Sequence, residues 1–339
     1  MNTSHPEIVK RFVNIEFSSS HALAWVRENS DYKNTLNAVS FTFPAGEKYF
    51  VKSVNFYMDR IKDPELKDRT RRFIYQEAMH AKEHDRANKF LLEVYPDGKL
   101  LERMTKVLFA ISRRCKPRAT QLATTCALEH FTALLAHVLL SRQEEFLVHS
   151  DEEFTNFWLW HAVEESEHKA VCFDVYEHIY GVGLLSYLHR ISMMAFISFI
   201  FVLSLGTCFS IIAFKQKIQQ LRHRLSGQKM KPPASTGTAK LSALFQGVAP
   251  SKYFDYYRRS FHPLNTDSST LIQKWKLNHA EFGLARDISD RVETILPSEF
   301  DEQAYLKLNP DVARAGVDPV EHYVRHGHKE GRAYREARD

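Results

Sequence analysis

Glycine and proline are scarce in this chain of 339 residues, with 12 of each, so long segments run without a helix breaker. Apolar residues recur at helical spacing within these segments, and the sequence therefore predicts an all-α fold. The four cysteines have neither a CxxC pair nor regular spacing, and the N-terminal segment has no apolar signal core. These absences argue against a secreted disulfide scaffold and favour a reducing, cytoplasmic compartment.

Acidic residues are absent from His178 to Phe254, a window that holds nine Lys or Arg residues in a chain with a net charge of +5. The basic residues follow an apolar run and are not interleaved with aromatic residues on a folded platform. This order favours an anionic membrane surface as a partner and argues against nucleic acid.

The apolar run itself spans residues 191–214 and contains 24 residues without a charge or a histidine. It is long enough to cross a bilayer, although a buried core helix would also fit. The basic residues after it predict that its C-terminal flank is cytoplasmic. A single span would then place everything before it outside the cytoplasm, which conflicts with the reducing compartment. We therefore expect monotopic attachment, through an interfacial helix or a hairpin bent at Gly206.

Turn and cap residues divide the remaining chain into predicted helices over 44–61, 64–94, 117–141 and 151–181, with a connecting helix over 99–114. A Pro- and Gly-rich stretch and a separately punctuated tail follow the apolar run. We expect a four-helix bundle over 1–183, a membrane-associating segment over 184–225, a linker over 226–238, helices that complete the main domain over 239–297, and a small C-terminal helical module over 298–339.

The stretch LWHAVEESEHKAVCFDVYEH, residues 159–178, holds three histidines and five acidic residues. A solvated helix face is the ordinary explanation of such a stretch. Two Glu-x-x-His patterns, Glu77 to His80 and Glu165 to His168, suggest another, because a helix with a glutamate precedes each one: Glu47 and Glu129. The order Glu, Glu-x-x-His, Glu, Glu-x-x-His over four helices is the ligand plan of di-iron and di-manganese carboxylate bundles.

The three-residue spacing places a carboxylate and an imidazole about 60° apart on a helix, so both can reach one metal ion. His161 lies on the same face as Glu165 and His168, and we include it among the predicted ligands. His84 shares a face with Glu77 and His80, and Glu164 adjoins Glu165. These two residues are expected either as additional ligands or as hydrogen-bond partners of ligands. No separate catalytic residue is assigned.

The motifs FPAGEKYF, QEAMHAKEH, WHAVEESEHKAVCFDVY and FHPLN together resemble the bacterial family of predicted metal-dependent hydrolases, a ferritin-like group. The resemblance covers roughly residues 5–285 and implies a ferritin-like bundle. From the apolar run and its basic flank, we expect this bundle at the cytoplasmic side of the inner membrane, monotopic or membrane-associated. The metal residues it implies are Glu47, Glu77, His80, Glu129, Glu165 and His168. The helix with His161 is also locally similar to that of di-iron arylamine N-oxygenases, and the tail resembles a short NPDV/HY/HG/EGR module.

Three functions remain open for such a site. The favoured one is an O2-dependent di-iron oxygenase or oxidase that acts on an apolar or membrane-derived substrate and needs an electron donor. A Glu/His site suits iron better than a closed zinc site, with manganese or zinc as alternatives. The second is a hydrolase with a metal-activated water, for which the absence of a G-x-S-x-G serine motif leaves room. The third is a non-catalytic metal-binding protein, and a homodimer is compatible with all three.

Overall fold

The computed structural model describes residues 5–11, 13, 15–27, 31–146, 150–226, 248–279, 295–297, 299–315 and 318–335. The regular elements within these ranges are helices, which confirms the predicted all-α class. The chain divides into two compact units, one over residues 1–8 and 15–275 and the other over residues 9–14 and 276–339.

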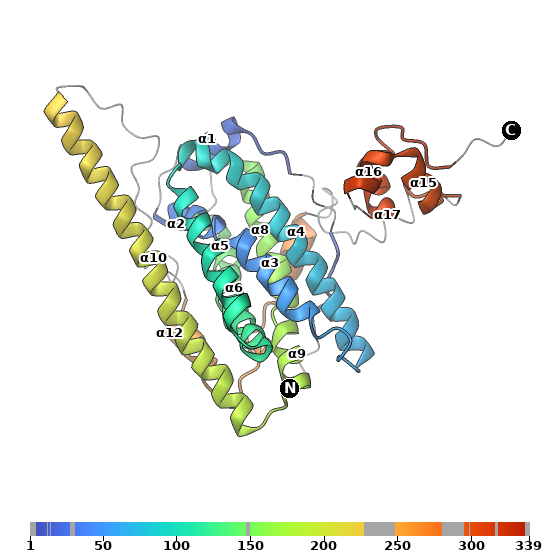
Figure 1. Ribbon diagram of the computed structural model, residues 1–339, viewed down its shortest axis with the longest axis horizontal. Coiled ribbons are helices and arrows are strands. Elements are labelled where there is room, and N and C mark those ends of the chain that lie inside the picture. Colours follow the sequence, from blue (N-terminus) through green and yellow to red (C-terminus); the bar gives the residue numbers. More distant parts are fainter. Residues whose placement is uncertain are drawn as a thin grey trace. The chain divides into compact units, whose positions relative to one another are not determined.

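Four helices of the first unit form a bundle in which α3 packs against α4 and α6, and α8 packs against the same two (Figure 1). Their bounds are α3 (Phe43–Asn55), α4 (Pro64–Val94), α6 (Arg118–Ser141) and α8 (Glu152–His168). The predicted helix starts are explained by caps, since Asp63 accepts from the Glu65 amide and Asp151 accepts from the Phe154 amide. Such caps satisfy amide groups that have no partner inside the helix.

Shorter helices cover this bundle. The N-terminal α1 and α2 pack on α4, whereas α5 packs on α3. The bounds of these and the other short elements are α1 (Ser19–Arg27), α2 (Asp31–Ser40), α5 (Gly98–Cys115), α7 (Gln143–Phe146), α12 (Pro250–Asp255), η1 (Pro263–Asn265) and α13 (Ser269–Asn278). Fully buried residues such as Phe73 and Leu122 fill the space between the helices, and each contributes about 1.5–3 kcal/mol by leaving water.

The helix predicted over 151–181 is instead two helices, because α8 ends at His168 and α9 (Val171–Tyr180) begins three residues later. The intervening Lys169 turns its ammonium group to the Thr266 carbonyl and the Ser268 hydroxyl. No glycine or proline occurs at the break, so the sequence holds no local signal for it. The helix predicted over 44–61 is also shorter and ends at Asn55.

The apolar run lies in α10 (Leu184–Ser226), which is one continuous helix through Gly206, so the structure has the helix and not the hairpin. Helix α10 runs beside α6, where His189 contacts Thr120 at 3.3 Å and the rings of Phe201 and Phe131 stack (Figure 1). By length and composition, Arg118–Ser141 and Leu184–Ser204 could each cross a membrane; 67% of the apolar window is buried in the former and 22% in the latter.

The second unit contains a small core around Tyr305, Val312 and Tyr323. Its elements are α15 (Glu302–Leu308), α16 (Pro310–Ala315), α17 (Pro319–His322) and η2 (Tyr323–Gly327). A side chain at Gly327 would collide with the Tyr305 hydroxyl, so the packing requires glycine there. The linker predicted over 226–238 lies outside the described residues except for Ser226. The segment boundaries given above remain predictions.

Candidate metal centre

Seven of the residues singled out in the sequence converge inside the bundle, although they come from four helices. No more than 2% of the surface of any of them is exposed. Glu47 comes from α3, Glu77 and His80 from α4, Glu129 from α6, and His161, Glu165 and His168 from α8. The stretch 159–168 of α8 is likewise buried, so a solvated helix face does not explain its charges.

One group within this centre surrounds His168. Its Nε2 atom lies 3.1 Å from Glu77 Oε1, 3.4 Å from Glu165 Oε2 and 3.6 Å from Glu129 Oε2. One ligand atom from each of the four residues lies within 4.8 Å of those of the others. Three carboxylates and one imidazole in this arrangement could hold a metal ion.

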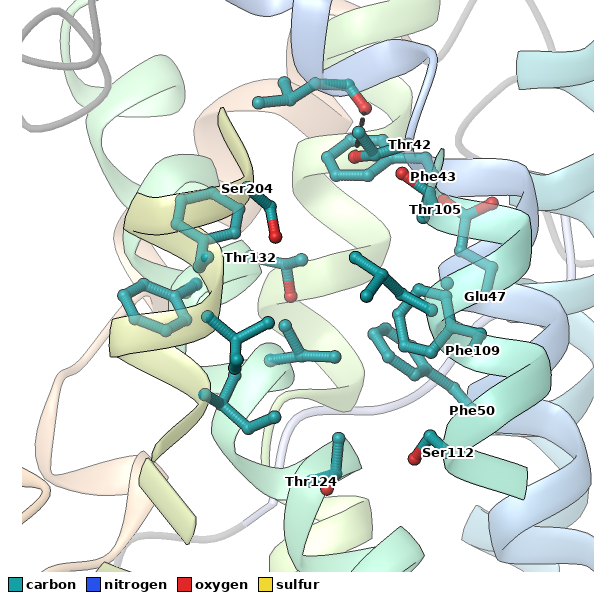
Figure 2. A pocket seen from close by; sticks show the side chains of 18 of the residues that line it. Thr42, Phe43, Glu47, Phe50, Thr105, Phe109, Ser112, Thr124, Thr132 and Ser204 are labelled. Carbon is teal, nitrogen blue, oxygen red and sulfur yellow. Dashed lines mark hydrogen bonds between the residues drawn. The ribbon is translucent and has the colours of Figure 1, made fainter. Parts of the chain in front are cut away.

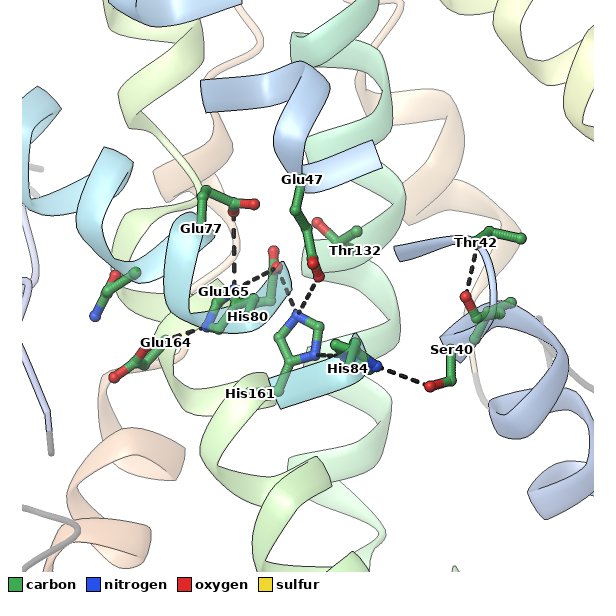
Figure 3. Close-up of polar contacts among 12 residues, drawn as sticks. Ser40, Thr42, Glu47, Glu77, His80, His84, Thr132, His161, Glu164 and Glu165 are labelled. Atoms are coloured by element: carbon green, nitrogen blue, oxygen red, sulfur yellow. Dashed lines mark hydrogen bonds and ion pairs between the residues drawn. The ribbon is translucent and has the colours of Figure 1, made fainter. Parts of the chain in front are cut away.

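A second group lies next to it, around His80 and His161. His161 Nε2 is 2.9 Å from Glu165 Oε1 and 3.8 Å from Glu47 Oε1, and His80 Nδ1 is 3.6 Å from the same Glu165 oxygen (Figure 3). Glu165 therefore belongs to both groups, with Oε1 toward His80 and His161 and Oε2 toward His168. A carboxylate in this position can bridge two metal ions.

A chain of hydrogen bonds fixes the orientation of His161. Asn88 donates its amide to the Ser40 carbonyl and accepts the Ser40 hydroxyl proton. The Ser40 hydroxyl oxygen therefore accepts from His84 Nδ1 (Figure 3). Burial lowers the pKa of His84 well below its usual value, so His84 is neutral and its Nε2 accepts. His161 Nδ1 donates to that atom at 2.7 Å. The lone pair on His161 Nε2 therefore points at Glu47 and Glu165.

The other two histidines are oriented in the same manner. Gln76 donates to Glu167, which leaves its carbonyl oxygen to accept from His168 Nδ1 at 2.8 Å. His80 Nε2 donates to Glu164 Oε2 at 3.0 Å. In each case the second ring nitrogen faces the carboxylate cluster. Partners of this kind commonly set the tautomer of metal-binding histidines.

The atoms at the middle of the cluster have no hydrogen-bond partner among the described residues. They include both carboxylate oxygens of Glu47, Glu77 and Glu129, together with His80 Nδ1 and His168 Nε2. Unpaired buried polar atoms are costly, and several carboxylates that face one another add repulsion. Both costs are removed when cations lie between these atoms, so the residues present fit a metal centre.

The pKa values of the glutamates in the cluster reflect the same burial and mutual repulsion. Burial raises the pKa values of Glu47, Glu77 and Glu129 well above the usual value, and the neighbouring glutamates raise them further. Burial also acts to raise the pKa of Glu165, but the charges and hydrogen bonds of His168 and His161 outweigh it and hold this pKa well below the usual value. Glu47, Glu77 and Glu129 therefore hold protons more tightly than free carboxyl groups do unless a cation replaces those protons, whereas Glu165 does not.

An apolar cavity of about 310 Å³ reaches this centre between α3, α5, α6 and α10. Phe43, Glu47, Phe50 and Phe109 form one part of its wall, and Thr132 of α6 lies across from them (Figure 2). Glu47 is the one member of the cluster that lines this cavity among the described residues. A volume of this size lies at the lower end of the range for small-molecule sites.

Fold and centre together define a class: an all-helical bundle that encloses a carboxylate and histidine cluster able to bind metal. A family profile described as predicted metal-dependent hydrolase matches residues 9–267, and the chain belongs to this family. Neither the curated proteins nor the solved structures give a significant match.

The structure gives hydrogen-bond partners to the two residues whose roles the sequence left open: His84 contacts His161 and Ser40, and Glu164 contacts His80. His84 also offers a ligand atom within 4.8 Å of those of Glu47 and His161, so both roles stay predictions. Gln76, Ser40 and Asn88 were not identified from the sequence. Gln76 lies four residues before His80 and Asn88 four after His84, which places both near the metal-facing side of α4 but gives no sign of their partners.

Proposed function

We propose that this chain is a two-metal carboxylate enzyme that acts on an apolar small molecule. The proposed ligands are Glu47, Glu77, His80, Glu129, His161, Glu165 and His168. The observation that supports this most strongly is the position of Glu165, whose two oxygens face two separate histidine groups within a cluster of unpaired buried carboxylates. The four glutamates offset the charge of two divalent cations.

Iron and an oxidative reaction with O2 are the proposed chemistry, because the cavity that reaches the cluster is lined mainly by apolar and aromatic residues. Oxygen and nitrogen ligands of this kind suit iron or manganese, and the bound metals would supply the redox chemistry, with electrons from an external donor. The chain's own part is to bind the substrate: Phe43, Phe50 and Phe109 hold it beside Glu47 and exclude water.

Hydrolysis is the second candidate, and the family description favours it. In that case the metal ions would activate a water, and the hydroxyl groups of Thr105 and Thr132 in the cavity wall would contact the polar part of an ester. The apolar lining would then bind the acyl or alkyl part.

The two candidates are separated by supplying the iron-loaded protein with an apolar substrate and a reductant. Oxidation predicts dioxygen uptake that depends on both and that is lost in Glu47→Ala. Ester turnover at equal rates with and without oxygen, by protein loaded with zinc, would refute the oxidative proposal and leave the hydrolytic one.

Membrane attachment through α10 is part of the proposal. Its first half presents large apolar side chains to solvent, among them Leu185 at 83%, Phe199 at 63% and Leu203 at 52% exposure. Exposed apolar surface of this kind marks an interaction site, and the basic residues that follow in the sequence suit an anionic lipid surface. Because α10 also lines the cavity, a substrate dissolved in the membrane would have a short path to Glu47.

A further inference from the structure

The cavity has a carboxyl group of the metal centre at one end and a lysine ammonium group at the other. Among the described residues that line it, the charged ones are Glu47 and Lys116. Ser53 of α3 contacts Thr125 of α6 at 2.6 Å, and the two helices run in opposite directions, so Glu47 is level with about Phe131. Lys116 lies two residues before the start of α6, and its carbonyl accepts from Gln121. Positions 121 and 131 are separated by about 15 Å along a helix.

Lys116 makes no ion pair with the part of the chain that the structure describes. Its ammonium group lies 4.3 Å from the centre of the Phe196 ring, and burial lowers the pKa of Lys116. The ammonium group is therefore partly withdrawn from water without a carboxylate to compensate. An attraction to one aromatic ring replaces little of the lost hydration.

The surroundings of Lys116 also lack negative charge. The sequence SRRCKPR at 112–118 holds three further basic residues, and no Asp or Glu occurs between Arg103 and Leu128. Arg113, Arg114 and Arg118 are exposed beside the cavity but do not line it. This end of the cavity is therefore favourable for an anion, whereas the interior between its ends is apolar.

From this arrangement we propose that the cavity binds a single-chain anionic amphiphile, with its head group at Lys116 and its hydrocarbon chain extended toward Glu47. The proposal rests on the proposed function only in taking the Glu47 end of the cavity as the reactive metal centre. The binding site itself is independent of the metal. Carboxylate and phosphate head groups both carry the negative charge and the acceptor oxygens that would pair with the Lys116 ammonium group. In this orientation the chain, and not the head group, lies at the metal cluster.

Binding of hexadecanoate, hexadecyl phosphate and uncharged hexadecanol to the full chain tests this proposal. We expect at least one of the two anions to bind more tightly than hexadecanol, and we expect Lys116→Gln to remove most of this preference. A hydrogen-bonded charge pair predicts a change of about tenfold. Lys116→Arg should keep the preference. Arg114→Gln removes the same charge two residues away, outside the cavity lining, and should leave it nearly unchanged.

The measurement is made with metal-loaded protein and with chelator-treated protein. A preference for anions that survives Lys116→Gln but disappears on metal removal would place the head group at the metal and overturn this proposal, although the metal centre would stand. An equal loss in Lys116→Gln and Arg114→Gln, or no binding of any of the three probes, would also overturn it. If the chain binds no metal even when supplied with iron, but its preference for anions depends on Lys116, the binding site stands and the proposed enzyme is refuted.

Discussion

His84 Nε2 lies 2.7 Å from His161 Nδ1, and this contact determines which nitrogen of His161 faces the glutamates. The relationship is directional, because Asn88 and Ser40 oblige His84 to carry its proton on the opposite nitrogen. A histidine four residues after His80 thus supports a histidine on another helix. We therefore expect metal affinity and protein stability to depend on these surrounding residues as well as on the central cluster.

His84→Leu should weaken metal binding without abolishing it. The substitution removes the acceptor of His161 Nδ1, so the ring of His161 loses its fixed tautomer. Loss of such a partner typically lowers metal affinity about 10- to 100-fold. Competition with a chelator of known affinity measures the change. His137→Gln, on α6 and outside the cluster, is the control, and an equal effect in both variants would refute the role of the contact.

Glu129→Ala should remove at least one metal ion per chain. Glu129 is one of three carboxylates around His168 and is the one that α6 contributes, so the substitution removes a ligand from that group. Elemental analysis of purified protein gives the result directly. Glu65→Gln, at an exposed position on α4, is a matched control and should bind metal as the unaltered chain does. Full metal content in Glu129→Ala would exclude this residue as a ligand.

The metal-free protein should lose stability as pH rises above about 6.5. The pKa values of Glu47, Glu77, Glu129 and His168 are raised in the folded state, so folding favours their protons, and the unfolding free energy falls as pH increases toward these raised values. His80, whose pKa is lowered, is neutral in both states over this window. Its contribution is therefore constant there.

Bound metal replaces those protons, so the difference in melting temperature between metal-loaded and metal-free protein should widen from about pH 6.5 to about pH 9. Thermal melts with and without Mn²⁺ measure this. A difference that is constant across the window would contradict the assignment of protonated glutamates to the metal-free state.

Ser204→Trp should fill part of the cavity from the α10 side. Ser204 lines the cavity and is small, so an indole at this position would occupy part of the volume that the ligand fills. We expect at least about tenfold weaker binding of hexadecanol, with metal content unchanged. Ser192→Trp introduces the same side chain at an exposed position of α10 outside the lining. Unchanged affinity in Ser204→Trp would exclude this cavity as the binding site.

Phe199→Asp should reduce binding to vesicles that contain anionic lipid. Phe199 is 63% exposed on α10, and removing its insertion into lipid costs about 1.5–3 kcal/mol, or at least tenfold in affinity. Leu23→Asp makes a matched change at an exposed leucine of α1. Cosedimentation that is equally reduced in both variants would argue against α10 as the membrane contact.

The sequence predicted the parts of this structure that depend on local signals. The cap residues Asp63 and Asp151 located two helix starts, and the Glu-x-x-His spacing indicated the residues that converge. The break after His168 was not predictable, because it depends on Lys169 reaching Thr266 and Ser268, nearly a hundred residues later. Lys116 was missed for a similar reason. Its place in the wall of the cavity depends on how α5, α6 and α10 pack around that cavity, which a single lysine in the sequence does not indicate.

The metal content of the unaltered chain, purified without chelator and supplied with iron, tests the central proposal most directly. Two ions per chain are predicted, because Glu165 faces two histidine groups that each have carboxylate partners. A folded protein that binds less than one ion per chain after incubation with iron, manganese or zinc would contradict it.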